Sequence, residues 1–159
     1  MPEPAPPDPI DLALLSHLQQ DATLPQGTLG THVGLSAAAV NRRIRRLTDG
    51  GYITSHVAVL DPARLSHPLT VIAQIEAVSE EVDKLDDLQQ RLVACQNVQQ
   101  CYYVTGEWDF VLVLLVHDMD QYRQLTRDIF FLSGNIKRFK TLVVMDRAKV
   151  SLSVPINPA

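Results

Sequence analysis

The sequence predicts an α+β protein, with an N-terminal three-helix helix-turn-helix domain followed by a C-terminal ferredoxin-like domain of order βαββαβ. Three observations indicate this class. Apolar residues recur with a period near 3.6 through residues 10–49. From residue 69 onward, β-branched runs alternate with helical patterns. The charges are also segregated, because four arginines lie within residues 42–46, whereas residues 76–87 hold six acids and one lysine.

The first domain is expected to contain three helices, over residues 10–20, 26–33 and 37–49. Asp8 or Asp11 supplies favourable negative charge at the start of the first helix. Gly34 suits the left-handed position that ends the second helix, and Ser36 is a good N-cap for the third. Since Gly30 has no side chain, it lets the second and third helices approach closely. The pattern is that of a helix-turn-helix.

The second domain is expected to alternate strands and helices. The strands are predicted over residues 69–78, 98–105, 110–117 and 136–147. The helices are predicted over residues 80–95 and 119–132, the first of them with Val82, Leu85, Leu88, Leu92 and Val93 facing inward. This order is the split βαβ arrangement of ferredoxin-like domains.

The arginine-rich helix, residues 37–49, is predicted to lie in the major groove of double-stranded DNA, which is wide enough for an α-helix. No lysine or arginine precedes it, so the positive charge of the first domain is concentrated there. The alternative is a solvated basic helix in an ordinary bundle, although such helices usually mix charge signs. The candidate DNA-binding residues are Gln26, Thr28, Thr31, Ser36, Ala37, Ala38, Asn41, Arg42, Arg45 and Arg46.

Arg43 differs from the other three arginines because its spacing from Val40, Ile44 and Leu47 places it near the edge of the core. An ion pair with Asp11 or Asp21 is at least as good an expectation for it as a DNA contact.

Other features exclude several classes of function. No apolar run reaches the roughly 18–20 residues that span a bilayer, and the N-terminus lacks the features of a signal peptide, so we expect a cytoplasmic protein without membrane contact. Cys95 and Cys101 match no zinc or redox spacing, and the five histidines are scattered. No metal, no cofactor and no catalytic residue is predicted.

The sequence resembles the Lrp/AsnC, or feast/famine, family of transcriptional regulators over nearly its whole length after the leader. The resemblance rests on Val33-Gly34-Leu35-Ser36, on the pattern from Arg43-Ile44 through Leu47 and Gly51 to Ile53, and on Gly106-x-x-Asp109-Phe110. It implies a C-terminal ligand-sensing domain, homodimers that assemble to an octamer, and a small-molecule effector such as an amino acid at the interface between dimers.

The chain divides into five expected segments, and the resemblance adds a candidate effector site. The expected segments are a disordered proline-rich leader (1–8), a helix-turn-helix DNA-binding domain (9–53), a linker strand (54–67), a ligand-sensing and oligomerisation domain (68–150) and a C-terminal tail (151–159). The candidate effector-binding residues are Thr105, Gly106, Glu107, Trp108, Asp109, Phe139 and Thr141. The chain departs from the family's Thr-x-Thr pattern at Phe139, which removes a hydroxyl and fills space. On residues alone, 106–109 is equally a plain hairpin turn.

Two alternatives stay open at the level of sequence. Sirohaem decarboxylases share this two-domain architecture, and added tetrapyrrole would reveal such an enzyme by absorbance. A DNA-packaging protein without an effector would bind many DNA sequences with similar affinity. The unmixed arginine face of residues 37–49 favours the regulator.

Overall fold

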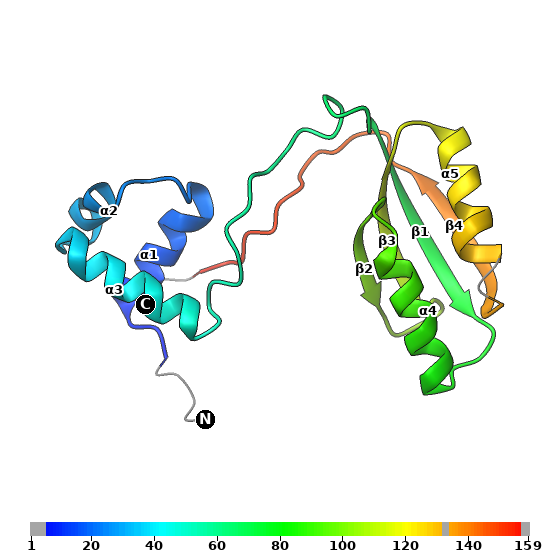
Figure 1. Ribbon diagram of the computed structural model, residues 1–159, viewed down its shortest axis with the longest axis horizontal. Coiled ribbons are helices and arrows are strands. Elements are labelled where there is room, and N and C mark those ends of the chain that lie inside the picture. The colour runs from blue at the N-terminus through cyan, green and yellow to red at the C-terminus, as the bar shows by residue number, and fades with distance from the viewer. Residues whose placement is uncertain (1–5, 132–133, 157–159) are drawn as a thin grey trace. The chain divides into compact units, whose positions relative to one another are not determined.

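Figure 1 shows the computed structural model of the chain, which describes residues 6–131 and 134–156. Residues 6–59 together with 150–156 form one compact unit, here the helical unit, and residues 60–149 form the other, here the sheet unit. Residues 1–5 of the predicted leader and 157–159 of the predicted tail lie outside the described residues.

The helical unit contains the three predicted helices, α1 (Pro9–Gln20), α2 (Gln26–Val33) and α3 (Ala37–Asp49). The start of α1 lies one residue earlier than predicted because Asp8 caps it and Pro9 occupies its first turn. Asp8 and Asp11 form a reciprocal capping box, with each carboxylate accepting from the other residue's backbone N–H at 2.8–2.9 Å. Thus both candidate acids serve the N-terminus of α1.

A small apolar core joins the three helices. Leu14 of α1, Leu29 of α2 and Val40 of α3 are almost fully buried against one another. Partly buried residues surround them, namely Ile10, Leu18, Leu24, Val33, Leu35 and Ile44. Because neither α1 nor α2 is long enough to be stable alone in water, this shared core holds the unit together.

The turn between α2 and α3 depends on two glycines. Gly34 adopts a left-handed conformation with φ of 70°, and its N–H donates to the Gly30 carbonyl. A Cβ added at Gly30 would lie 2.3 Å from the carbonyl oxygen of Leu35. A residue without a side chain is therefore required at position 30, but its tightest neighbour is the backbone of the turn rather than α3 itself.

Replacing Gly30 with alanine is expected to destabilise the helical unit by about 1–3 kcal/mol, because the turn backbone must shift to accept the methyl group. Gly27→Ala is the matched control. Its added Cβ meets nothing within 4 Å, so alanine there should stabilise α2 by about 0.5–1 kcal/mol. Denaturant unfolding followed by circular dichroism at 222 nm measures both, and equal effects of the two variants would contradict the close-packing argument.

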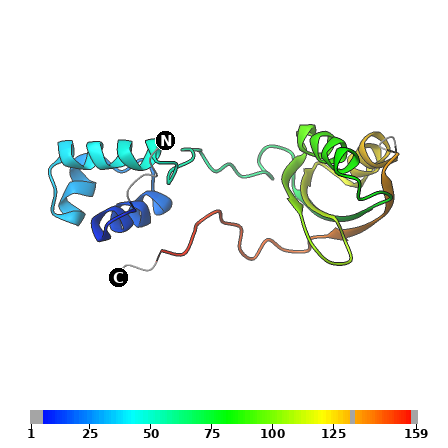
Figure 2. The same cartoon turned by 90° about the horizontal axis from the view of Figure 1, so that it is seen from below.

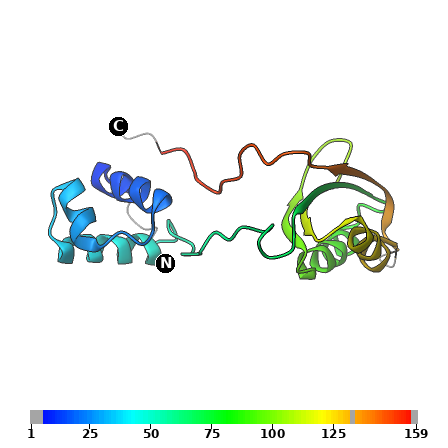
Figure 3. The ribbon, with the colours of Figure 1, turned by 90° about the horizontal axis from the view of Figure 1, so that it is seen from above.

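The sheet unit is a four-stranded antiparallel sheet. Its strands are β1 (Leu69–Ala77), β2 (Val98–Tyr103), β3 (Phe110–Val116) and β4 (Ile136–Val143), in the spatial order β2-β3-β1-β4. The helices α4 (Val82–Ala94) and α5 (Met119–Leu125) both cover the same face of the sheet, as Figures 2 and 3 show from opposite sides. The predicted ferredoxin-like order is confirmed.

Several boundaries differ from the sequence predictions. The helix predicted over 119–132 divides into α5 and a π-helical segment, η1 (Thr126–Phe131). Helix α4 is shorter than predicted at both ends, and the prediction that Val82 and Val93 face inward is wrong, since both are more than half exposed. Strand β4 ends at Val143, and residues 54–67 form no strand. A segment with an alternating pattern forms a β-strand only when it pairs with a neighbouring strand, and within the described residues this segment has no such partner.

Strand β3 is apolar on both faces. Its even-numbered residues from Phe110 to Val116 are fully buried beneath the helices. The odd-numbered residues point to the opposite face, which no helix covers in Figures 2 and 3. We call this face the open sheet face; its apolar residues are Ile72, Val111, Val113, Leu115 and Leu142. A sheet that faced water on this side would instead alternate apolar with polar residues.

Candidate functional site

The outer face of α3 carries two free guanidinium groups. Arg42 and Arg45 lie three residues apart, so they share one face, and both are exposed. Within the described residues neither forms an ion pair. Asn41 beside them is half-buried, and Ala37 and Ala38 are exposed at the N-terminal end of the same helix. Cations and an amide on one accessible helix face can donate to phosphates and to base edges.

The predicted contacts from α2 and the turn are also at the surface. Gln26, Thr28 and Thr31 are exposed, and the Thr31 hydroxyl donates to the Gly27 carbonyl at 3.1 Å. The Ser36 hydroxyl accepts from the Ala39 N–H at 3.3 Å, which confirms Ser36 as the N-cap of α3. Ser36 therefore caps α3, and any contact of its hydroxyl with DNA would be made in addition to this cap.

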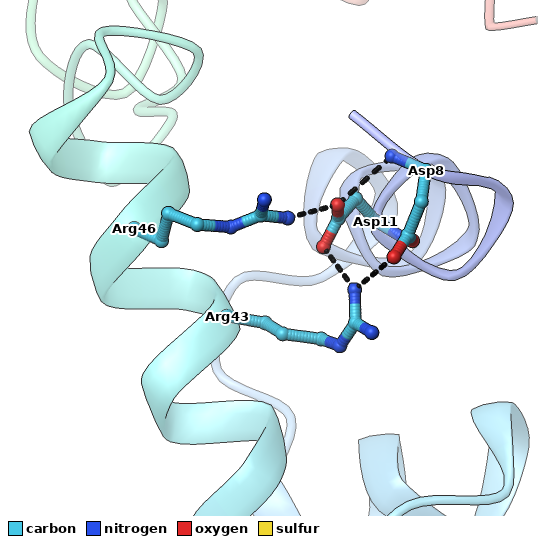
Figure 4. A network of polar contacts seen from close by, with 4 residues as sticks. All are labelled: Asp8, Asp11, Arg43 and Arg46. Atoms are coloured by element: carbon cyan, nitrogen blue, oxygen red, sulfur yellow. Dashed lines mark hydrogen bonds and ion pairs between the residues drawn. The ribbon is translucent and has the colours of Figure 1, made fainter. Parts of the chain in front are cut away.

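The other two arginines of α3 turn towards α1 (Figure 4). Arg43 Nη1 lies 2.6 Å from Asp8 Oδ2 and 2.8 Å from Asp11 Oδ1. Arg46 also bonds the Asp11 carboxylate. The predicted ion pair of Arg43 with Asp11 is confirmed, whereas Asp21 instead accepts from the backbone and hydroxyl of Thr23.

Asp11 is the centre of this network and is fully buried. Burial by itself raises the pKa of Asp11, but the hydrogen bond from the Asp8 N–H and the two guanidinium groups outweigh it, so the net pKa lies below the usual value. The hydrogen bond from Arg43 likewise lowers the pKa of Asp8. Both carboxylates therefore stay ionised at neutral pH and keep their arginines in place.

The pairing of Arg46 with Asp11 was not predicted from the sequence. The contact occupies one nitrogen of the Arg46 guanidinium, and this side chain remains 45% exposed. A phosphate contact by Arg46 stays a prediction. The spacing of the arginines could have indicated the contact with Asp11, because residues 43 and 46 lie about one helical turn apart and therefore face the same neighbouring helix.

The loop between β2 and β3 is held by β1. Gly106 in this loop has a positive φ of 123°. Asp109 accepts from the Ala77 N–H through its carboxylate at 2.7 Å, and its own N–H donates to the Ile75 carbonyl at 2.9 Å. The Asp109 carboxylate thus already has a backbone partner that positions the loop, while Thr105 beside it is exposed.

The middle of the loop contacts β4. Arg138 donates to Glu107 at 2.9 Å and lies over the Trp108 ring at 4.7 Å from its centre. Arg138 also forms an ion pair with Glu76 of β1. The two carboxylates, Glu76 and Glu107, raise the pKa of Arg138. These side chains belong to the open sheet face, since Glu76 alternates with the buried Ile75.

The other two effector candidates lie on the opposite face of β4. Phe139 packs against Phe130 and Phe131 of η1, with ring centres 4.9 and 5.9 Å apart. Thr141 shares a 2.7 Å hydrogen bond with the Tyr122 hydroxyl of α5. The structure thus brings Glu107 and Trp108 to Arg138, but it does not unite them with Phe139 and Thr141. Beside Phe139 is an open hollow of about 340 Å³, lined by Phe130, Phe131, Gly134, Ile136, Lys137, Arg138 and Phe139.

The two units correspond to two known domain families. A model of the Lrp/AsnC ligand binding domain matches residues 70–154, and a winged helix-turn-helix DNA-binding model matches residues 7–54. The chain belongs to the Lrp/AsnC family of transcriptional regulators. Its α3 is therefore part of a helix-turn-helix DNA-binding domain, and the sheet unit belongs to the ligand-binding class of that family.

Relatives in the Lrp/AsnC family match almost end to end. The chain is 38% identical to an uncharacterised HTH-type transcriptional regulator of Sinorhizobium fredii, over 94% of this chain and 88% of that protein. It is 32% identical to the leucine-responsive regulatory protein of Haemophilus influenzae, over 89% of this chain and 86% of that protein.

Solved structures have the same fold. An AsnC family transcriptional regulator from Agrobacterium tumefaciens superposes with a TM-score of 0.89 at 27% identity, covering 94% of this chain and 97% of that one. A transcriptional regulator from Neisseria meningitidis, solved as an L-Met complex, gives a TM-score of 0.90 at 24% identity over 96% of this chain and 98% of that one.

No helix in the described part of the chain is long and apolar enough to cross a membrane. Residues 6–131 and 134–156 also contain no group of three or more histidine, cysteine, aspartate or glutamate side chains that could hold a metal ion.

Proposed function

We propose that this cytoplasmic regulator reads DNA with the Arg42–Arg45 face of α3 in the major groove. The observation that carries the proposal is the division of the four arginines. Arg43 and Arg46 pair with carboxylates at the start of α1, whereas Arg42 and Arg45 are exposed and form no ion pair within the described chain. Ala37 and Ala38 would allow close approach at the N-terminal end of α3, and the exposed hydroxyls of α2 would contact phosphates.

The open sheet face supports assembly into homodimers. Its apolar side chains lie on the side that α4 and α5 leave uncovered, so a second copy packing there would remove them from water. Two-fold dimers would present two α3 helices to half-sites spaced by about one helical turn of DNA or its multiples. We further propose that these dimers assemble into an octamer.

The effector is proposed to be an amino acid bound where dimers meet, in contact with the Gly106–Asp109 loop of one chain and with Phe139 and Thr141. Two relatives support this class, since one is named leucine-responsive and another was solved with L-Met. Within one chain, the loop contacts Arg138 on one face of β4, whereas Phe139 and Thr141 lie on the other face of this strand. A site that uses both sets therefore needs a second chain.

A thermal-shift screen of the twenty amino acids tests this proposal. An amino acid present at about 100 times its dissociation constant should stabilise the sheet unit by about 2.7 kcal/mol. Apolar and aromatic amino acids are expected to give the largest shifts, because Phe139 and its phenylalanine neighbours supply an apolar wall. Phe139→Thr should change which amino acids respond, while mass measurement in the same samples reports assembly.

The Arg42→Ala/Arg45→Ala variant is the control for this screen, because its effector domain is unaltered and its shifts should match those of the wild type. Flat responses in the wild type and in Phe139→Thr, with both proteins folded, would refute an amino-acid effector. A response in Phe139→Thr alone would mean that Phe139 closes the site.

A further inference from the structure

The C-terminal segment, residues 150–156, belongs to the helical unit although the sheet unit lies between them in the sequence. The side-chain amide of Gln19 on α1 binds the backbone of this segment at Val154. Gln19 Nε2 donates to the Val154 carbonyl at 3.1 Å, and the Val154 N–H donates to Gln19 Oε1 at 2.6 Å. One glutamine amide thus pairs with both backbone groups of one residue, as a neighbouring β-strand would.

The segment is shaped for this contact by its own sequence. Pro155 restricts the residue before it to extended conformations, so Val154 is biased towards the geometry that Gln19 binds. The Ser151 hydroxyl accepts from the Ser153 N–H at 3.0 Å, which sets the chain direction just before Val154. The side chains of Val150, Leu152 and Val154 are exposed and Ile156 is half-buried, so the docking depends on the two hydrogen bonds between Gln19 and the Val154 backbone.

The contact gives the helical unit a second connection to the sheet unit. The chain passes from the helical unit into β1 through the linker, and it returns from β4 through residues 144–149. Phe139 and Thr141, the proposed effector residues, lie on β4 itself. A single linker restricts the motion of a tethered domain weakly, whereas a second attachment raises the effective concentration of each unit near the other.

We propose that residues 150–156 are a C-terminal strap, which docks on α1 of its own chain through Gln19 and couples β4 to the DNA-binding unit. The binding site is the Gln19 side chain on α1, and its ligand is an extended backbone that ends in Val-Pro. That coupling matters for regulation only if the proposed function holds, but the docking itself does not depend on DNA or effector.

Amide hydrogen exchange of the C-terminal peptide in the full-length protein tests the docking directly. Gln19→Ala should make the Val154 amide exchange about tenfold faster, since it removes the acceptor that protects this amide. Gln20→Ala is the matched control, because Gln20 is the exposed neighbour on the same helix, and it should leave exchange unchanged. Equal exchange in the two variants would overturn the strap.

A second pair of variants tests recognition through the backbone. Val154→Ala keeps the N–H and the carbonyl, so it should leave the protection of neighbouring amides near the wild-type level. Val154→Pro removes the N–H that Gln19 accepts and should release the segment. Release by both variants would show that the valine side chain, rather than the backbone, makes the contact, and would overturn the proposed mode of recognition.

Mixing distinguishes docking within one chain from docking between chains. Chains that end at Lys149 keep Gln19 free, and Gln19→Ala chains keep their tail free. The tails of the Gln19→Ala chains should stay unprotected in mixed oligomers if the strap is intramolecular. Recovery of protection would mean that the tail docks on a second copy, and it would overturn the intramolecular strap.

The functional consequence is measured on DNA. Gln19→Ala should weaken binding to a duplex selected by the wild-type protein about threefold, because a less restricted helical unit loses more orientational freedom on binding. If the wild-type protein selects no duplex, the proposed DNA contacts fail while the exchange result still decides the docking. Loss of protection with unchanged DNA affinity would overturn the coupling.

Discussion

Replacing Arg42 and Arg45 together with alanine is expected to weaken binding to a wild-type-selected DNA duplex about 100-fold, which corresponds to about 2.8 kcal/mol. These are the two cations of α3 that are exposed and form no ion pair within the described residues. The slope of log affinity against log salt should also become shallower, because fewer counterions are released on binding. Fluorescence anisotropy at several salt concentrations measures both quantities.

The matched control is Arg123→Ala/Arg127→Ala, which removes the same charge from exposed positions of the sheet unit. It should change DNA affinity much less than the α3 variant does. Circular dichroism and oligomer mass should be unaltered in both double variants. Equal losses of affinity in the two variants would show that net charge, rather than the α3 face, attaches the protein to DNA.

Asp11→Asn is expected to destabilise the helical unit by roughly 2–4 kcal/mol, since it removes the charge that holds two guanidinium groups and part of the α1 capping box. For a unit this small, the loss corresponds to a fall in melting temperature of about 10 °C or more. The asparagine has nearly the shape of aspartate, so the effect isolates charge from packing. Thermal unfolding followed at 222 nm gives the measurement.

The same network predicts a pH dependence with a definite sign. Because the folded-state pKa of Asp11 lies below the usual 3.8, its contribution is fully present above about pH 4 and is lost as the pH falls through the lower folded value. Asp11→Asn should remove part of this acid sensitivity. Asp49→Asn, an exposed position at the end of α3, is the control and should melt like the wild type. A wild-type melting temperature that stays constant from pH 6 to pH 3 would contradict this account.

The helical unit was predictable because its signals are local. Its apolar spacing, the N-cap Ser36 and the left-handed Gly34 each act within a few residues, and the bounds of α2 and α3 agree with the prediction. The order of strands and helices along the chain followed from the same kind of signal in the sheet unit. The π-helical segment η1 did not, because apolar periodicity does not distinguish a π-turn from an α-turn over six residues.

The candidate effector site was predictable only in part. The loop at Gly106–Asp109 lies between β2 and β3 as expected, but the partners of its side chains could not be derived from spacing. Asp109 contacts Ala77, 32 positions away, and Arg138 joins Glu107 across 31 positions. Such contacts depend on strand order and register, which place distant residues side by side.

By itself the sequence determined that this protein has a helix-turn-helix followed by a βαββαβ domain, and that its positive charge is concentrated on α3, because periodicity, caps and charge runs act locally. Only the tertiary structure decided which arginines remain free. Arg43 and Arg46 pair with acids 32 to 35 positions away at the start of α1, whereas Arg42 and Arg45 face outward. The physical reason is that a carboxylate neutralises an arginine by proximity in space, and the packing of α1 on α3 creates that proximity.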